Sequence, residues 1–138
     1  MGNDLDALSL TQKLISFDTI NPPGQELACI RFIADVLSGC GFEVSILEYE
    51  EGRANLVARL AATEPGGPLP IVFSGHVDTV PLGQGRWTMP PFDGLVSDGR
   101  VYGRGSSDMK SGIAAFVVAV RGLARVPVRS ADIADPRA

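Results

Sequence analysis

Apolar residues recur at helical spacing in three stretches of the chain. The first helix is predicted over residues 4–17, with Asn3 as its N-cap and the Asn-Pro-Pro-Gly segment at 21–24 as its abrupt end. The second helix is predicted over 26–38, directly before a glycine-rich turn, and the third over 110–125. Because each stretch carries one apolar face, each helix is expected to bury that face in a core.

Shorter segments show the patterns that are typical of strands. Apolar and polar residues alternate over most of 42–47, and a second short strand is predicted around 55–60 after the Glu51-Gly52 turn, so the pair predicts a hairpin. A second, small hairpin is predicted at 95–102. The continuous apolar run at 70–75 predicts a central strand that is covered on both faces. A long loop rich in proline and glycine follows at 77–93. Helices that alternate with strands predict a layered α/β domain.

Composition narrows the class of protein. The 138 residues suffice for one domain or a piece of one, and 45% hydrophobic with 20% charged residues predicts a buried core rather than disorder. The net charge of −4, without a cluster of Lys or Arg, argues against partners such as nucleic acid or an anionic membrane. The longest apolar run, at 113–120, is far shorter than the ~20 residues that a membrane helix needs.

Other features of the sequence indicate location and exclude nucleotide binding. The N-terminus has no basic leader segment, so the expected location is the cytoplasm. Cys29 and Cys40 are predicted to be small buried apolar side chains rather than a disulfide, and no function is assigned to them. The glycine-rich segment at 103–112 matches neither a dinucleotide-binding fingerprint nor a P-loop.

His76 is the single histidine of the chain and follows the apolar run, with Asp78 two residues later and Asp108 before the third helix. An imidazole at the end of a strand can bind a metal through one ring nitrogen while a nearby carboxylate accepts the proton of the other nitrogen. Asp78 is the candidate for that carboxylate, and Asp108 is a candidate second ligand. Because ligands collect at the carboxyl ends of strands in α/β sheets, we expect the three side chains to converge at one edge.

Each of these residues also has a purely structural interpretation, which the residues alone leave open. In that interpretation His76 is a surface or hydrogen-bonded histidine, and Asp78 forms a turn. Asp108 is then the N-cap of the third helix, where its carboxylate would accept hydrogen bonds from free backbone N–H groups. Arg104 and Lys110, which flank Asp108, would be solvated charges.

Two segments together carry a resemblance to a known family. They are FSGHVDTVP at 73–81 and YGRGSSDMKSG at 102–112, with Trp87, Pro91-Phe92 and Asp98-Gly99 between them. The joint pattern resembles the acetylornithine deacetylase, succinyl-diaminopimelate desuccinylase and carboxypeptidase G family of zinc metallohydrolases, from the first helix to about Ile133. The resemblance implies a two-zinc amidohydrolase with a layered αβα, zinc-peptidase-like α/β catalytic domain and a mostly parallel central sheet.

The resemblance also implies roles for the three candidate residues. By position, His76 would be a ligand of one metal ion, and Asp108 would be the carboxylate that bridges both ions. Asp78 would be the catalytic-site residue that holds the imidazole of His76. The peptide bond after Asp108 is typically cis in this family. Two zinc ions per site are implied as cofactors, with cobalt or manganese as possible replacements.

The family's remaining site residues have no counterpart in the chain. They are a Glu-Glu pair, a further acidic ligand and a C-terminal histidine, and an inserted dimerisation domain is lacking too. Residues 129–133 resemble the start of the strand that ends in the Glu-Glu pair. We therefore interpret 1–133 as the N-terminal part of the catalytic domain and 134–138 as a divergent tail. A catalytic zinc needs about three protein ligands, so the ligand set is incomplete.

The resemblance implies hydrolysis of amide bonds in N-acyl amino acids or small peptides, and we expect the chain alone to be truncated and inactive. Complete members of the family are homodimers. For this chain we expect unspecific association, because a sheet that lacks a strand leaves an open edge. The alternative is a non-catalytic remnant or a protein-interaction module, which the lack of an acidic pair after Asp108 also fits.

Overall fold

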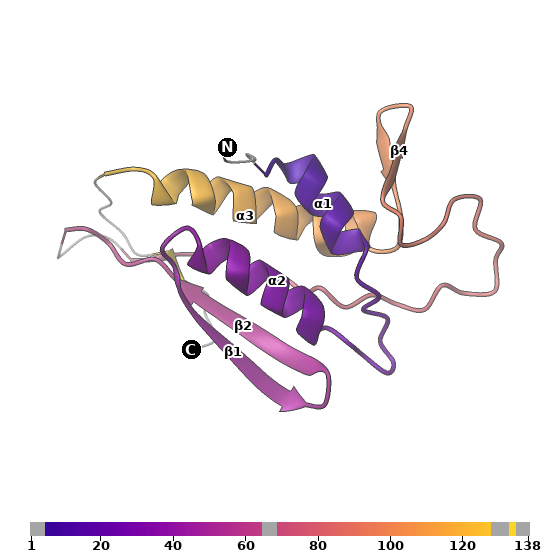
Figure 1. The fold of residues 1–138 in the computed structure, drawn as a ribbon, viewed down its shortest axis with the longest axis horizontal. Helices are drawn as coiled ribbons and strands as arrows, with labels where there is room; N and C mark the ends of the chain where they lie inside the picture. The colour runs from indigo at the N-terminus through magenta and orange to yellow at the C-terminus, as the bar shows by residue number, and fades with distance from the viewer. Residues whose placement is uncertain (1–4, 65–68, 128–132, 135–138) are drawn as a thin grey trace.

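The computed structural model describes residues 5–64, 69–127 and 133–134 as helices with short strands beside them (Figure 1). The helices are α1 (Ala7–Ile15), α2 (Leu27–Ser38) and α3 (Ser111–Ala124), and a π-helical turn (Ser106–Lys110) leads into α3. The strands are β1 (Glu43–Glu50), β2 (Arg53–Arg59), β3 (Ile71–Val72), β4 (Leu95–Ser97), β5 (Arg100–Tyr102) and β6 (Ile133–Ala134). The chain therefore has the α/β fold that the sequence predicts.

All three predicted helices form, with ends that differ by a few residues. Helix α1 begins at Ala7 because Asp6 is its N-cap, and the Asp6 carboxylate accepts a 2.7 Å hydrogen bond from the backbone N–H of Ser9. Asn3, the predicted cap, lies outside the described residues. In the part of the chain that the structure describes, no helix is long and apolar enough to cross a membrane.

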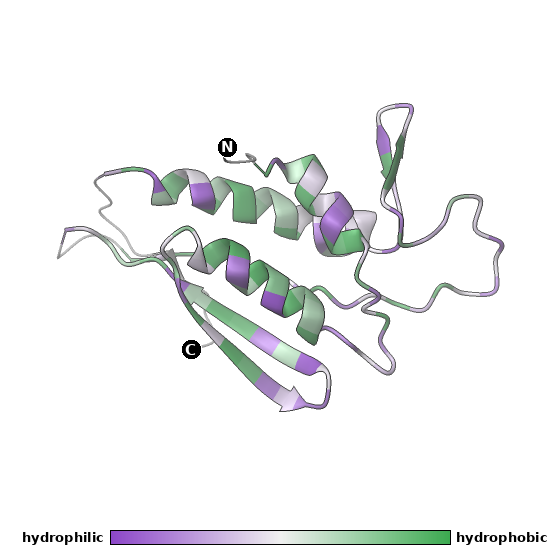
Figure 2. Cartoon of the chain, viewed as in Figure 1, coloured by the Kyte–Doolittle hydropathy of each residue, from purple (hydrophilic) through white to green (hydrophobic). Residues whose placement is uncertain are grey.

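The helices bury their apolar faces in one core. Helix α1 packs on α3, and α2 packs on the β1–β2 hairpin (Figure 1). Figure 2 shows hydrophobic residues along all three helices. Burial in this core raises the pKa of the Cys29 thiol to about 11, and Cys40 is half-buried, so the two free thiols fit the predicted apolar role. The buried core residues that the helices contribute are Leu10, Leu14, Cys29, Ile30, Ile33, Leu37, Ile113, Ala114, Val117 and Val120.

Three strand pairs occur among the described residues, and one of them is parallel. Strands β1 and β2 form the predicted antiparallel hairpin, with Ile46 opposite Leu56. Strand β3 runs parallel to β6, so that Ile71 lies opposite Ile133. The other two described pairs are antiparallel, so the mostly parallel central sheet stays a prediction. Residues 128–132 and 135–138, which carry most of the predicted strand start and tail, lie outside the described residues.

The predicted central strand at 70–75 is shorter and more exposed than its apolar run indicates. Strand β3 consists of Ile71 and Val72, which are 52% and 39% exposed. Phe73, the next residue, stacks on Phe116 of α3 with the ring centroids 5.5 Å apart. An apolar strand is buried only where other layers cover both of its faces, so the prediction of a doubly covered strand is wrong for the described structure.

The predicted long loop runs from the end of β3 to β4 and is attached to the segment that follows α1. The backbone N–H of Thr79 donates to the carbonyl of Thr19 at 2.9 Å, and the N–H of Asn21 donates to the carbonyl of Thr79 at 2.8 Å. The buried hydroxyl of Thr19 donates to the carbonyl of Val77 at 2.6 Å. These bonds fix the loop where it leaves β3.

The predicted second hairpin forms from β4 and β5 and projects away from the helices (Figure 1). Its turn holds Asp98 and Gly99 at φ values of 49° and 72°. A two-residue hairpin turn of this hand needs positive φ at both positions, and Asp-Gly is one of the pairs that tolerates it.

Candidate metal centre

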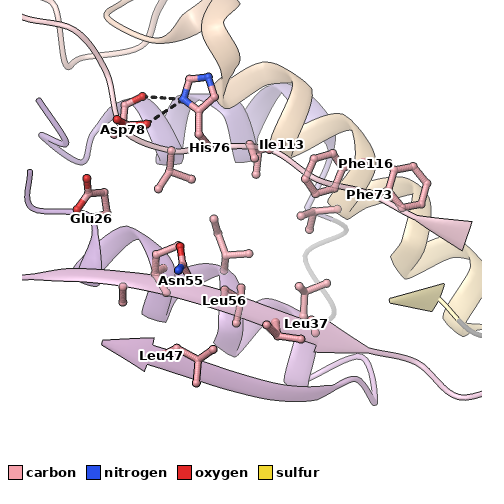
Figure 3. Close-up of a pocket in the computed structure, with 18 of the residues that line it drawn as sticks. Glu26, Leu37, Leu47, Asn55, Leu56, Phe73, His76, Asp78, Ile113 and Phe116 are labelled. Atoms are coloured by element: carbon pink, nitrogen blue, oxygen red, sulfur yellow. Dashed lines mark hydrogen bonds and ion pairs between the residues drawn. The ribbon is translucent and has the colours of Figure 1, made fainter. Parts of the chain in front are cut away.

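His76 lies at the start of the long loop, between two carboxylates. Its Nδ1 lies 3.0 Å from Oδ1 of Asp78 and 3.1 Å from the main-chain oxygen of the same residue (Figure 3). Its Nε2 lies 3.0 Å from Oδ1 of Asp108. The structure thus brings together the three side chains that the sequence singled out, and both ring nitrogens face acceptors.

Asp78 is held from a second side by Asn21. The side-chain Nδ2 of Asn21 donates to Oδ2 of Asp78 at 3.1 Å, while Oδ1 of the same carboxylate faces His76. The sequence analysis used Asn21 only as part of the segment that ends the first helix. The two residues are 57 positions apart, so no local pattern could indicate their contact.

Asp108 lies in the π-helical turn before α3 and does not cap that helix. Its backbone is non-helical, with φ −128° and ψ 98°, and the N-cap position belongs to Lys110, without a side-chain hydrogen bond. The Asp108 side chain instead faces His76. The N-cap interpretation is therefore wrong. The peptide bond between Asp108 and Met109 is cis, as the resemblance implied.

Lys110 is fully buried, so the interpretation of this residue as a solvated charge is wrong. Its Nζ donates to the carbonyl of Phe17 at 2.8 Å and so joins the turn that carries Asp108 to the segment that follows α1. Burial lowers the pKa of Lys110, while Cys29 and Asp18 act in the opposite direction.

Gly105 allows this turn to pack closely against the loop. Its φ of 82° is unfavourable for residues with a side chain. A Cβ at this position would also lie 2.8 Å from Cγ2 of Thr79 and 3.1 Å from Cδ of Lys110. The lack of a side chain at Gly105 therefore allows the turn that carries Asp108 to lie close to the loop that carries His76.

The pKa of His76 reflects two opposing influences. Partial burial lowers it, but hydrogen bonds and negative charge from Asp78 and Asp108 outweigh burial, so the pKa of His76 is raised. The pair of carboxylates therefore favours the protonated imidazole when nothing else is bound. A cation bound to these carboxylates would supply the positive charge that the protonated imidazole supplies in its absence.

Two cavities adjoin His76 and Asp78. One, of about 440 Å³, is lined by Asn21 and by the 103–108 segment. The other, of about 270 Å³, is lined mostly by apolar side chains from α2, β1, β2 and α3, with a few polar side chains among them (Figure 3). The polar groups of the centre therefore lie between a mostly apolar cavity and a more polar one.

Arg104 contacts the long loop at two positions beside the larger cavity. Its Nη2 donates to the carbonyl of Pro81 at 3.0 Å, and its Cζ lies 4.9 Å from the ring centroid of Trp87. Trp87 in turn donates from Nε1 to the carbonyl of Leu82 at 3.1 Å. Arg104 is thus half-buried and bonded within the fold, rather than the solvated charge of the structural interpretation.

The donor atoms fit part of a metal site. An imidazole nitrogen and a carboxylate oxygen suit zinc, and a carboxylate on the other ring nitrogen is the usual support of a metal-binding histidine. Among residues 5–64 and 69–127, however, no group of three or more His, Cys, Asp or Glu side chains is arranged to hold a metal ion. His76 and Asp108 therefore supply two donors of the kinds that bind zinc, fewer than the roughly three protein ligands of a catalytic zinc site.

Comparison with known proteins confirms the resemblance inferred from the sequence. Residues 72–134 match the family described as Peptidase family M20/M25/M40. The chain is 43% identical over 117 residues to a succinyl-diaminopimelate desuccinylase of Wolbachia pipientis, covering 84% of this chain and 28% of the relative. It is 42% identical over 132 residues to the same enzyme of Delftia acidovorans, covering 92% and 33%. The chain thus spans about a third or less of these curated relatives.

Solved structures show the same fold. An M20 family metallo-carboxypeptidase from Sulfolobus solfataricus matches with a TM-score of 0.77 and 18% identity, covering 97% of this chain and 30% of that chain. Human carnosine dipeptidase 1 matches with a TM-score of 0.73 and 23% identity, covering 94% and 30%. At this level of identity the likeness concerns the fold alone.

Proposed function

Because the chain is related to the M20/M25/M40 peptidase family, we propose that it forms the N-terminal part of the catalytic domain of a metal-dependent hydrolase. The reaction is hydrolysis of an amide bond in an N-acyl amino acid or a small peptide. The observation that carries this proposal is the imidazole of His76, which has a carboxylate oxygen 3.0 Å from each ring nitrogen. Proteins orient metal-binding histidines in this way, with a carboxylate on the nitrogen that does not bind the metal.

In this proposal His76 and Asp108 are metal ligands, and Asp78 keeps the proton of the imidazole on Nδ1. Nε2 then presents its lone pair toward the side on which Asp108 lies. Two zinc ions, or cobalt or manganese, would be held with the help of ligands from outside the described residues. When bound, such an ion polarises a substrate carbonyl and lowers the pKa of a bound water.

The similarity to succinyl-diaminopimelate desuccinylases favours an N-succinyl amino acid as substrate over an N-acetyl one. The larger cavity beside His76 offers amide and hydroxyl groups, from Asn21 and from Ser106 and Ser107, that suit a polar acyl group. A cytoplasmic location and a homodimer stay predictions, and so does the inactivity of residues 1–138 alone.

Zinc titration by calorimetry tests the proposed metal ligands. We expect weak, saturable binding to the chain, loss of binding in His76→Ala and binding at least about tenfold weaker in Asp108→Asn. Asp98→Asn is the matched control, because Asp98 is an exposed carboxylate in the β4–β5 turn and asparagine tolerates its positive φ. Zinc affinity in the control should equal that of the unsubstituted chain.

Two outcomes would contradict the proposal. The first is a lack of any zinc binding, and the second is binding that His76→Ala leaves unchanged. Hydrolysis is assayed in parallel with N-succinyl and N-acetyl amino acids at saturating zinc, and no turnover is expected because two protein donors leave each ion incompletely held. Turnover by the chain alone would show that the expected inactivity is wrong.

A further inference from the structure

We propose that Asn21 is a positioning residue of the metal centre: its side-chain amide orients Asp78 and thereby selects the tautomer of His76 that can bind a metal through Nε2. The contacts are Asn21 Nδ2 to Asp78 Oδ2 at 3.1 Å and Asp78 Oδ1 to His76 Nδ1 at 3.0 Å. This inference deepens the proposed function and rests on it for its biological meaning.

The backbone of Asn21 is fixed independently of its side chain. Its N–H donates to the carbonyl of Thr79 at 2.8 Å, and the N–H of Thr79 donates to the carbonyl of Thr19 at 2.9 Å. The buried hydroxyl of Thr19 adds a bond of 2.6 Å to the carbonyl of Val77. Removal of the side-chain amide therefore takes one hydrogen bond from Asp78 while the segments that carry both residues stay joined.

A neutral histidine has two tautomers, and the centre offers an acceptor to each of them. With the proton on Nδ1, the ring donates to Oδ1 or to the main-chain oxygen of Asp78, and the lone pair of Nε2 stays available. With the proton on Nε2, the ring donates to Asp108 and cannot bind a metal through that nitrogen. An oriented Asp78 carboxylate therefore favours the tautomer that can bind metal.

An amide suits this task because it donates a hydrogen bond and carries no charge. Asn21 satisfies Oδ2 of Asp78 without competing for the proton of His76, and it keeps the carboxylate from turning Oδ1 away from the ring. An aspartate at position 21 would have the same size but would repel Asp78.

The test uses NMR of the metal-free chain with ¹⁵N-labelled histidine, at a pH above the titration range of the ring. Because His76 is the single histidine, the two ring nitrogens give one set of signals that reports the ratio of the tautomers. We expect Asn21→Ala to lower the ratio of the Nδ1–H to the Nε2–H form about two- to fivefold, as loss of one ordinary hydrogen bond would. Gln84→Ala, which removes an exposed amide from the long loop, should leave the ratio unchanged.

A second substitution shows whether Asn21 acts through Asp78. In an Asp78→Asn background, adding Asn21→Ala should change the tautomer ratio no further. Asn21→Asp should lower the ratio more than Asn21→Ala does. If the alanine variant fails to fold, the aspartate variant tests the role of Asn21 in its place. A ratio that neither Asn21 variant changes, or a change that persists unreduced in the Asp78→Asn background, would overturn the inference.

This test is separate from that of the proposed function because it needs neither metal nor turnover. An unchanged tautomer ratio together with zinc binding that depends on His76 would overturn the role of Asn21 alone. A changed ratio without zinc binding would overturn the metal centre and leave the Asn21–Asp78–His76 arrangement in place.

Discussion

Leu14 of α1 is fully buried, whereas the side chains of His76 and Asp108 are 49% and 85% exposed. The first belongs to the packed helices, and the other two belong to the polar segment between β3 and α3. Apolar burial is not directional, so it stabilises the helices without fixing individual atoms. The exposed centre depends on hydrogen bonds, which require defined distances and angles.

Two buried polar side chains connect these regions. The hydroxyl of Thr19 bonds to the carbonyl of Val77, and the ammonium of Lys110 bonds to the carbonyl of Phe17. Each joins the segment that follows α1 to one of the two motifs that carry the candidate ligands. Substitutions in the helices should therefore change mainly the free energy of unfolding, and substitutions at these links should change mainly the geometry of the centre.

The largest effect on stability is expected from Leu14→Ala. Removal of a fully buried leucine leaves a cavity and should lower the free energy of unfolding by about 3 kcal/mol. Leu8→Ala on the same helix is the matched control, because Leu8 is 44% exposed and should change it by no more than about 0.5 kcal/mol. Urea unfolding followed by circular dichroism measures both. Equal losses would mean that α1 is not packed as described.

A smaller effect on stability is expected from Lys110→Met. The substitution removes a buried charge at nearly constant volume but leaves the carbonyl of Phe17 without this donor, so the net change should be within about 1 kcal/mol. The ring ¹⁵N signals of His76 should nevertheless shift, since the turn that carries Asp108 loses its bond to the segment that follows α1. Lys13→Met, at the other lysine of the chain, controls for loss of a positive charge.

The difference in stability between the unsubstituted chain and Lys110→Met should depend on pH. Burial lowers the pKa of Lys110 below 10.5, so in alkaline solution the folded chain loses this proton before the unfolded chain does. Between these two pKa values the unfolded state binds more protons, and the stability of the unsubstituted chain relative to Lys110→Met should rise with pH. A relative stability that falls over this range would contradict the burial of the ammonium group.

The helices and the hairpins could be predicted because their signals are local. The spacing of apolar residues predicts α1, α2 and α3, and Asp98-Gly99 supplies the backbone freedom that the second hairpin needs. The sequence predicts the start of α1 a few residues too early, because Asn3 and Asp6 are both favourable N-cap residues. The structure shows that the Asp6 carboxylate accepts the hydrogen bond from a free backbone N–H.

Features that depend on contacts between distant parts of the chain could not be predicted from local sequence patterns. The exposure of Ile71 and Val72 depends on what covers β3, and an apolar run carries no information about that. Asp108 fits two roles at the start of a helix, and the choice depends on His76, which is 32 residues away. The convergence of the candidate ligands could be expected from the strand ends, but the bond from Asn21 to Asp78 could not.

Crystals of the chain grown with zinc, with anomalous diffraction recorded at the zinc edge, test the central claim most directly. The account predicts a zinc peak about 2.0–2.1 Å from Nε2 of His76 and about 2.0–2.2 Å from a carboxylate oxygen of Asp108, with Asp78 still bonded to Nδ1. A zinc ion bound through Nδ1 of His76, or zinc bound only to residues outside this centre, would contradict it.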